Sequence, residues 1–197
     1  RRYILSGRLS MQRQELAIKF YEAARAELIV RIRLRENIII FYVGAVATLL
    51  GVAFGNTAKS NEILFVIPVL SLAASILVSH HNSLIGALGL YCAVELKDCL
   101  NSNLESTVVQ WDESKSLING SSKAVRTRLV PHLLIIPAPV LITLIANVDY
   151  VSVLCSWKAV VWFVGLVCFV SSSAYIFLSG LDRKRNFGEI GSIIQKI

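Results

Sequence analysis

The fold of this chain is decided by residues 63–94, which read ILFVIPVLSLAASILVSHHNSLIGALGLYCAV and contain no Asp, Glu, Lys or Arg. A helix rises about 1.5 Å per residue, so roughly 20 apolar residues cross the hydrocarbon core of a bilayer. The uncharged stretch is longer than one crossing, and a polar group at residues 79–83 interrupts it. We therefore expect a membrane helix over residues 63–78, followed by a helix that leaves the bilayer at residues 80–83 and packs on protein.

Three further runs without charge cover residues 37–58, 129–148 and 159–181. The chain is 55% hydrophobic and only 17% charged, which is typical of integral membrane proteins. We expect an all-α integral membrane protein with four transmembrane helices. Its expected parts are a long cytoplasmic amphipathic helix (1–36), a hairpin of spans 1 and 2 (37–81), a cytoplasmic helical segment (82–128), a hairpin of spans 3 and 4 (129–181) and a cytoplasmic tail (182–197).

The basic residues predict the orientation of these spans. Of the 20 Lys and Arg residues, only Lys59 and Lys158 fall in the two short loops that follow spans 1 and 3. Positive charge accumulates on the cytoplasmic side of membrane proteins, so both termini and the middle segment are expected there. We therefore attribute the net charge of +7 to basic residues that set the membrane topology and contact anionic lipids, and not to nucleic-acid binding.

The N-terminal helix is expected over residues 9–36, with Ser10 as its cap. It combines basic residues with a wide apolar face that includes Phe20, Tyr21 and Leu28. Such a helix lies in the membrane interface, or it projects into the cytoplasm and packs on other helices of the same assembly. The aromatic side chains favour packing, so these three residues are candidates for an oligomer interface.

Small and hydroxyl-bearing residues mark the faces of spans 1 and 2. Gly44, Thr48 and Gly51 form a stripe on the first span, and Ser71 and Ser75 give the second a slightly polar face. Small residues let helices approach closely in lipid, which predicts a helix–helix contact. The alternative is that these residues line a narrow pore.

The third apolar run contains Pro131, Pro137 and Pro139. Prolines remove backbone donors and bend a helix, so several carbonyl groups need other partners in lipid. We expect a kinked helix. The kink either lines a cavity or simply fits the bundle.

Two polar groups outside the spans have open interpretations. His80 and His81 either mark a helix end at the lipid headgroups or form a pH-sensitive gate. Trp111, Asp112 and Glu113 either contact a partner or ligand, or form an exposed amphipathic turn.

The sequence argues against several classes of chemistry. No Asp, Glu, Lys or Arg lies within the four apolar runs, whereas ion-coupled transporters use such groups. No P-loop, GxSxG or HExxH motif occurs, and Cys92 and Cys99, seven residues apart on one helix face, are read as buried structural residues. No enzyme activity, cofactor or metal site is expected.

The layout of residues 9–197 resembles the small bacterial membrane proteins of anti-phage defence systems. The most distinctive short segments of this layout are Arg35-Glu36-Asn37, Ser79-His-His-Asn and Trp111-Asp-Glu-Ser-Lys. The resemblance implies an oligomeric inner-membrane effector, gated through its cytoplasmic helices by a soluble sensor partner, which permeabilises the host membrane. It transfers no site residues.

Two other functions stay open on the sequence. The chain could be a non-conducting anchor or scaffold that recruits a soluble cytoplasmic partner. A lipid-active enzyme has the least support, because Ser79 and His80 are adjacent and adjacent side chains on a helix point apart.

Overall fold

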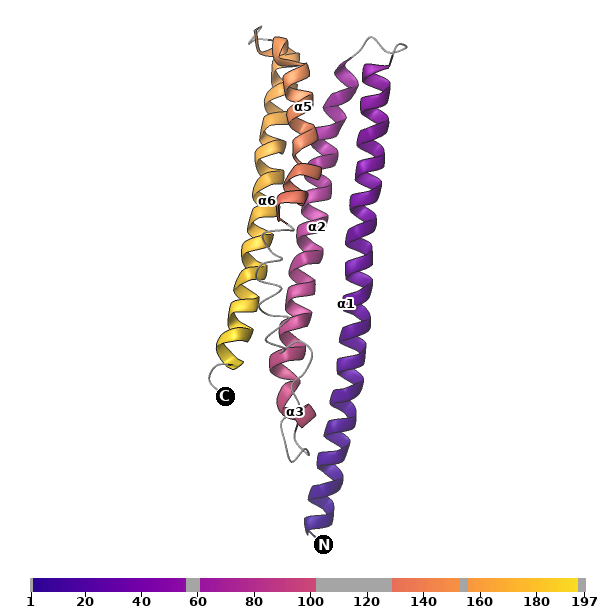
Figure 1. The fold of residues 1–197 in the computed structure, drawn as a ribbon, viewed down its shortest axis with the longest axis vertical. Helices are drawn as coiled ribbons and strands as arrows, with labels where there is room; N and C mark the ends of the chain where they lie inside the picture. The colour runs from indigo at the N-terminus through magenta and orange to yellow at the C-terminus, as the bar shows by residue number, and fades with distance from the viewer. Residues whose placement is uncertain (1, 56–60, 102–128, 153–155, 195–197) are drawn as a thin grey trace. The chain divides into compact units, whose positions relative to one another are not determined.

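The computed structural model describes residues 2–55, 61–101, 129–152 and 156–194. These residues contain helices and turns and no strand, as the sequence predicts (Figure 1). The helical elements are, in chain order, α1 (Arg2–Phe54), the 3-10 helix η1 (Asn61–Phe65), α2 (Val66–Leu90), the π-helix η2 (Tyr91–Glu95), α3 (Lys97–Asn101), a helix at residues 129–135, α5 (Ala138–Ala146), the 3-10 helix η4 (Val148–Ser152) and α6 (Trp157–Ile194).

Among the described residues, four helical segments are long and apolar enough to cross a membrane, and this agrees with the four candidate spans that the sequence predicts. They are Gln14–Phe54, Glu62–Glu95, Leu129–Ala146 and Trp157–Asp182. The four uncharged runs of the sequence lie within or overlap these segments.

The chain divides into two compact units. The first, here called the span unit, consists of Leu34–Asn82 and Arg126–Leu181. The second, here called the flanking unit, consists of Arg1–Arg33, Ser83–Val125 and Asp182–Ile197. The candidate functional site lies in the span unit.

Two helices are longer than the sequence pattern suggests. α1 begins at Arg2, so the expectation that Ser10 caps its start is wrong, and α1 continues as one helix to Phe54. No Pro or Gly occurs between Gly7 and Gly44, so nothing in the sequence breaks the helix where charge gives way to apolar residues. α6 likewise continues past the end of the apolar run to Ile194.

The expectation that Cys92 and Cys99 share one buried helix face is wrong. Cys92 is 1% exposed, whereas Cys99 is exposed. The π-helix η2 and the turn at Leu96 separate them, and a π-helical turn holds more residues than an α-helical turn. This change in helical phase rotates Cys99 away from the packed side.

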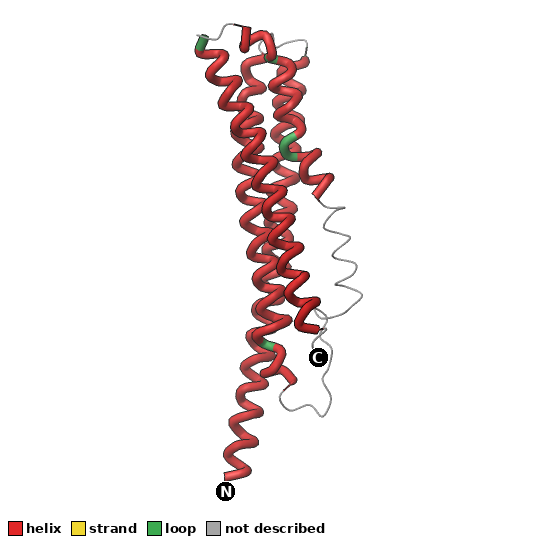
Figure 2. The backbone as a smooth tube through the Cα atoms, turned by 90° about the vertical axis from the view of Figure 1, so that its left-hand side faces the viewer, coloured by secondary structure: helices red, strands yellow, loops and turns green. Residues whose placement is uncertain are grey.

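The third candidate span is interrupted at Ile136 and Pro137, as its prolines predict. The structure has helix at residues 129–135, a turn at these two residues and then α5, and Figure 2 shows the interruption as a short loop. The Val140 N–H bonds to the Pro137 carbonyl at 3.0 Å, one residue short of the α-helical pattern. The Ile136 carbonyl is therefore released from the helix ladder.

The core of the span unit is formed by side chains from all four spans. It includes Tyr42 and Val46 of α1, Ile67 and Val78 of α2, and Ile176 of α6, with Ile136, Val140 and Leu144 of the third span. α6 comes close to this core at Gly165, where an added Cβ would lie 3.1 Å from Leu144 Cδ2 and 3.5 Å from Pro68 Cγ.

We predict that Gly165→Leu destabilises the chain. The larger side chain overlaps Leu144 and Pro68, and overpacking of a core costs about 1–3 kcal/mol. Thermal unfolding of the detergent-purified protein should show a melting temperature several degrees lower. An unchanged melting temperature would contradict the close approach of α6 to α5.

Candidate functional site

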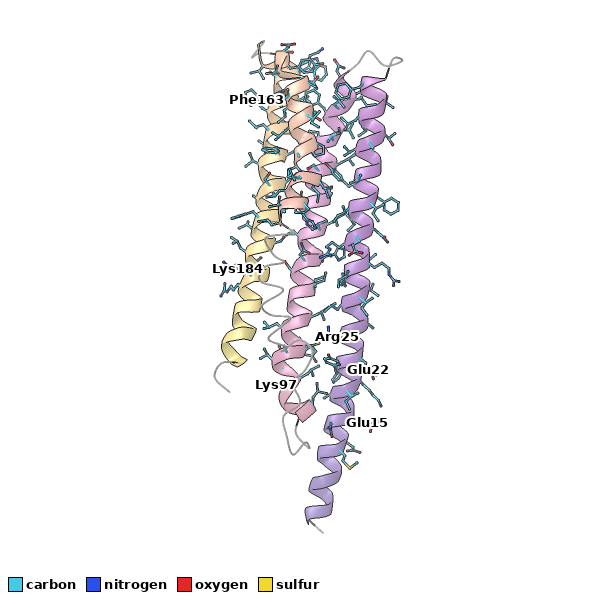
Figure 3. The ribbon with its side chains drawn as sticks, viewed as in Figure 1. Glu15, Glu22, Arg25, Lys97, Phe163 and Lys184 are labelled. Carbon is cyan, nitrogen blue, oxygen red and sulfur yellow. The ribbon has the colours of Figure 1, made fainter. Side chains whose placement is uncertain are left out.

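The buried interior of the span unit contains polar side chains beside its apolar core, whereas many large apolar side chains lie on its surface. Large exposed apolar residues cover its helices, and Phe163 is one of those on the outer side of α6 (Figure 3). Among the residues whose burial the structure describes, eight polar residues are buried, and all eight belong to the span unit. We call this set the polar seam; it consists of Arg35, Ser71, Ser75, His81, Thr143, Asn147, Ser172 and Ser179.

The middle of the seam is organised around the Ile136 carbonyl. The Tyr42 hydroxyl donates to this oxygen at 2.6 Å and the Ser71 hydroxyl at 2.9 Å. Ser71 Oγ also lies 3.3 Å from Ser172 Oγ. Tyr42 comes from α1, Ser71 from α2 and Ser172 from α6, so all four spans meet at one freed carbonyl.

Ser75 lies one helical turn from Ser71 on α2 and is fully buried. Its Oγ has no hydrogen-bond partner among the residues that the structure describes. A buried hydroxyl without a partner costs about 1–3 kcal/mol, so water or an ion next to Ser75 would stabilise it. The middle of the polar seam therefore contains a hydroxyl group, that of Ser75, which can form a hydrogen bond with a further polar group.

The end of the seam nearest Glu62 contains Thr143 and Asn147. The Thr143 hydroxyl is 3.4 Å from the Leu64 carbonyl, and the Asn147 amide donates to the Thr143 carbonyl at 2.9 Å. At the same end, Lys158 Nζ lies 2.9 Å from Glu62 Oε1. This ion pair joins the start of α6 to η1.

The opposite end of the seam contains a buried arginine. Arg35 is only 8% exposed, and its Nη1 donates to Asn82 Oδ1 at 3.0 Å. The Asn82 amide lies 3.5 Å from Ser179 Oγ, and Ser179 donates to the Ile176 carbonyl at 3.1 Å. A chain of polar contacts therefore links α1, α2 and α6 at this end.

Arg35 lies just before the first apolar run, outside the spans that the sequence predicts, but its side chain is buried in the span unit. It also brings together two stretches that the sequence marked as distinctive, residues 35–37 and 79–82, through its bond to Asn82.

Apolar side chains separate three levels of the polar seam: the Arg35 end, the middle level around the Ile136 carbonyl, and the Thr143 end. Val78 of α2 and Ile176 of α6 lie between the middle level and the Arg35 end, and both are almost fully buried. Val140 and Ile67, which are 0% exposed, lie between the middle level and Thr143. The polar seam therefore has three polar levels, and one apolar layer lies between each pair of neighbouring levels.

The candidates for packing or pore lining separate into two groups. Ser71 and Ser75 lie inside the single chain. Gly44, Thr48 and Gly51 are exposed, and an added Cβ at either glycine meets nothing within 4 Å. The small-residue stripe of α1 therefore faces away from the other spans of its own chain.

The candidates on the N-terminal half of α1 also differ from one another. Phe20 is exposed, whereas Tyr21 and Leu28 are half-buried, on the same side of the helix as the buried Ala17 and Ala24. The packed side of this half therefore includes Tyr21 and Leu28, and Phe20 is directed outward.

The two histidines have different surroundings. His81 is buried within the seam, and His80 is exposed, with 5.9 Å between their ring centroids. Trp111, Asp112 and Glu113, the expected partner-contact element, lie outside the described residues.

Sequence reasoning missed Tyr42, Thr143, Asn147, Ser172 and the inward direction of Arg35. For Tyr42, Thr143 and Asn147 the signal was present, because each is a single polar residue in a long apolar run, whereas Ser172 is one of three consecutive serines and Arg35 lies in a charged stretch. The missing information was the partner of each group, which depends on the rotation of the helices in the bundle. Pro137 and Pro139 indicated that some carbonyls of this span lose their helical partners, but not that the Ile136 carbonyl is one of them, since it is released by the shift of the Val140 N–H to the Pro137 carbonyl.

Comparisons of the chain with protein-family models, curated proteins and solved structures gave no match. Among the described residues, no group of three or more His, Cys, Asp or Glu side chains could hold a metal ion. The function is therefore argued from the geometry of the seam.

We predict that Tyr42 and Ser71 share the stabilisation of the Ile136 carbonyl. Tyr42→Phe and Ser71→Ala should each cost about 1 kcal/mol, since each removes one donor. The double variant should cost more than the sum, because the buried carbonyl then loses both hydroxyl donors. Unfolding of the four proteins in the same detergent tests this, and strict additivity would contradict a shared acceptor.

Proposed function

We propose that the chain is an oligomeric, channel- or pore-like membrane effector, and that its conducting path is the polar seam inside each chain. The observation that carries the proposal is the polar seam itself, a set of polar side chains buried inside the span unit while many large apolar residues of the same helices are exposed. Hydroxyl and amide groups can replace part of the hydration shell of a permeating species. A path between copies would meet mostly Val, Ile and Phe side chains.

In this proposal the described conformation is closed. Val78 and Ile176 form the apolar layer at one side of the middle level, and Val140 and Ile67 form the layer at the other. Apolar constrictions block conduction because they exclude water, and a small displacement of the helices is enough to wet them. α1 and α6 continue without a break into the flanking unit, so they would carry movement of that unit to the layers.

The proposed orientation places both termini and residues 82–128 in the cytoplasm of a bacterium, with the spans in the inner membrane. The distribution of Lys and Arg supports it, since 18 of the 20 fall in these segments. The proposed setting is anti-phage defence, with a soluble sensor protein acting on the cytoplasmic helices and anionic lipids contacting the basic residues. The proposal contains no catalytic step and no cofactor.

We propose that copies of the chain assemble through the small-residue stripe on the exposed side of α1. Gly44, Thr48 and Gly51 are exposed on the side of the helix opposite to the buried Tyr42 and Val46. In lipid, a surface of small residues lets a second helix approach closely, which favours contact with another copy of α1.

We predict that Gly44→Leu reduces the oligomer mass without lowering the melting temperature. The new side chain meets nothing in its own chain but blocks the approach of a second α1. Gly89→Leu is the matched control, because a Cβ added at Gly89 also meets nothing within 4 Å. Native mass measurement in detergent tests the idea, and an unchanged mass for Gly44→Leu would contradict assembly through this stripe.

We predict that Val78→Ser and Ile176→Ser make the closed path leak. Each replaces part of an apolar layer by a hydroxyl, which favours wetting. Val69→Ser is the control, since Val69 lies on α2 with its side chain exposed. Ion flux into liposomes should rise at least tenfold for the two layer variants and stay at the wild-type level for the control.

The same flux experiment decides between the channel and the alternative function. If Val78→Ser and Ile176→Ser both remain folded but neither raises the ion flux above that of the control, the proposal of a conducting path through the polar seam is refuted. The chain would then be assigned as a non-conducting anchor that recruits a soluble cytoplasmic partner.

A further inference from the structure

The π-helix η2 changes which residues of the following helix lie on the packed side of the flanking unit. Before the end of η2, Ile85 is 6% exposed and Cys92, seven residues later, is 1% exposed. In an uninterrupted α-helix seven residues make two turns less about 20°, so Cys99 would come next on this side. Instead Cys99 is exposed and Leu100 is half-buried. The π turn therefore moves the packed side of the chain by one residue.

This shift is visible in the backbone hydrogen bonds. The Leu96 N–H donates to the Tyr91 carbonyl at 3.2 Å, five residues back. The Leu100 N–H donates to the Leu96 carbonyl at 3.0 Å, four residues back, so the α-helical pattern has returned. A π turn holds one more residue than an α turn and leaves regular helix on either side. In the α-helical alternative, the Leu96 N–H would move to the Cys92 carbonyl.

The local sequence permits this alternative. No proline occurs between Pro68 and Pro131, so every residue from 85 to 101 can donate in an α-helix. Contacts within the flanking unit favour the π turn, since Leu96 is 6% exposed and the Gln14 amide of α1 donates to the Leu100 carbonyl at 3.3 Å. A rotation of α3 by one residue would break the Gln14 contact.

We propose that η2 is a register switch with two states. In the described state η2 is π-helical and Leu100 lies on the packed side. In the second state residues 85–101 form one α-helix, α3 is rotated by about 100°, and Cys99 takes the place of Leu100. The first state gains the packing of Leu100 and the Gln14 contact, and the second gains a regular backbone. A partner that contacts α3 can therefore shift the balance between them, whether or not the chain conducts.

The switch is tested by exchanging the two side chains that compete for the packed side. In Cys99→Leu/Leu100→Cys, the leucine reaches the packed side only if η2 becomes α-helical, and this turns the thiol at position 100 outward. In the matched control Cys99→Ser/Leu100→Cys, no leucine favours the second state, so the same thiol stays half-buried. Maleimide labelling of the full chain in detergent measures its accessibility, and each rate is divided by that of the same variant unfolded in guanidinium.

Mass spectrometry separates this thiol from the other cysteines. In both variants, the tryptic peptide of residues 98–115 contains no Cys except the one at position 100. We expect labelling about fivefold faster, or more, in the exchange variant than in the serine control, which corresponds to a small shift in free energy between the states. Equal rates in the two variants would overturn the switch.

Deletion of Val94 from the exchange variant is the second control. It removes the extra residue of the π turn, so an α-helical η2 then keeps position 100 on the packed side, and labelling should fall to the rate of the serine control. Fast labelling that survives the deletion would assign the exposure to fraying of α3 and would also overturn the switch. If the exchange variant does not fold, Cys99→Met/Leu100→Cys replaces it, because Met adapts to irregular packing.

Discussion

The span unit depends on one backbone oxygen, the carbonyl of Ile136. Pro137 and Pro139 prevent the third span from continuing as a regular helix, and the Val140 N–H turns to the Pro137 carbonyl. In an apolar medium a carbonyl without a partner is costly, so the freed oxygen requires donors from elsewhere. Tyr42 and Ser71 supply them, and Ser172 joins the cluster through Ser71. A local defect in one helix thereby fixes the rotation of the other three.

The same constraint explains why polar side chains lie inside the span unit, next to its apolar core. Donors must face the freed carbonyl, which turns the Ser71 and Ser75 side of α2 inward. Many large apolar residues, such as Phe41 and Val167, are exposed, and in the proposed membrane setting they would contact lipid. An inward polar seam interrupted by apolar layers is the arrangement from which we infer a closed path.

Much of the fold could be predicted from the sequence, because uncharged runs as long as residues 63–94 have few structural solutions in water. The faces of the helices could not be predicted. The sequence marks one face on each of the first two spans but does not show whether that face meets the same chain or another copy, so Gly44 and Ser71 looked equivalent although one faces out and the other in. The burial of Arg35 was hidden for a related reason, since it depends on Asn82, which lies 47 positions later in the chain.

The most direct test of this account is to measure the NMR signal of the Ile136 carbonyl carbon with the protein in a lipid bilayer. Labelling isoleucine carbonyls with ¹³C and proline nitrogens with ¹⁵N selects only the peptide bonds Ile67–Pro68 and Ile136–Pro137 in solid-state NMR spectra. The account predicts that Tyr42→Phe and Ser71→Ala each shift the Ile136 signal and leave the Ile67 signal in place. An Ile136 signal that neither variant moves would show that the four spans do not meet at this oxygen, and would contradict the account.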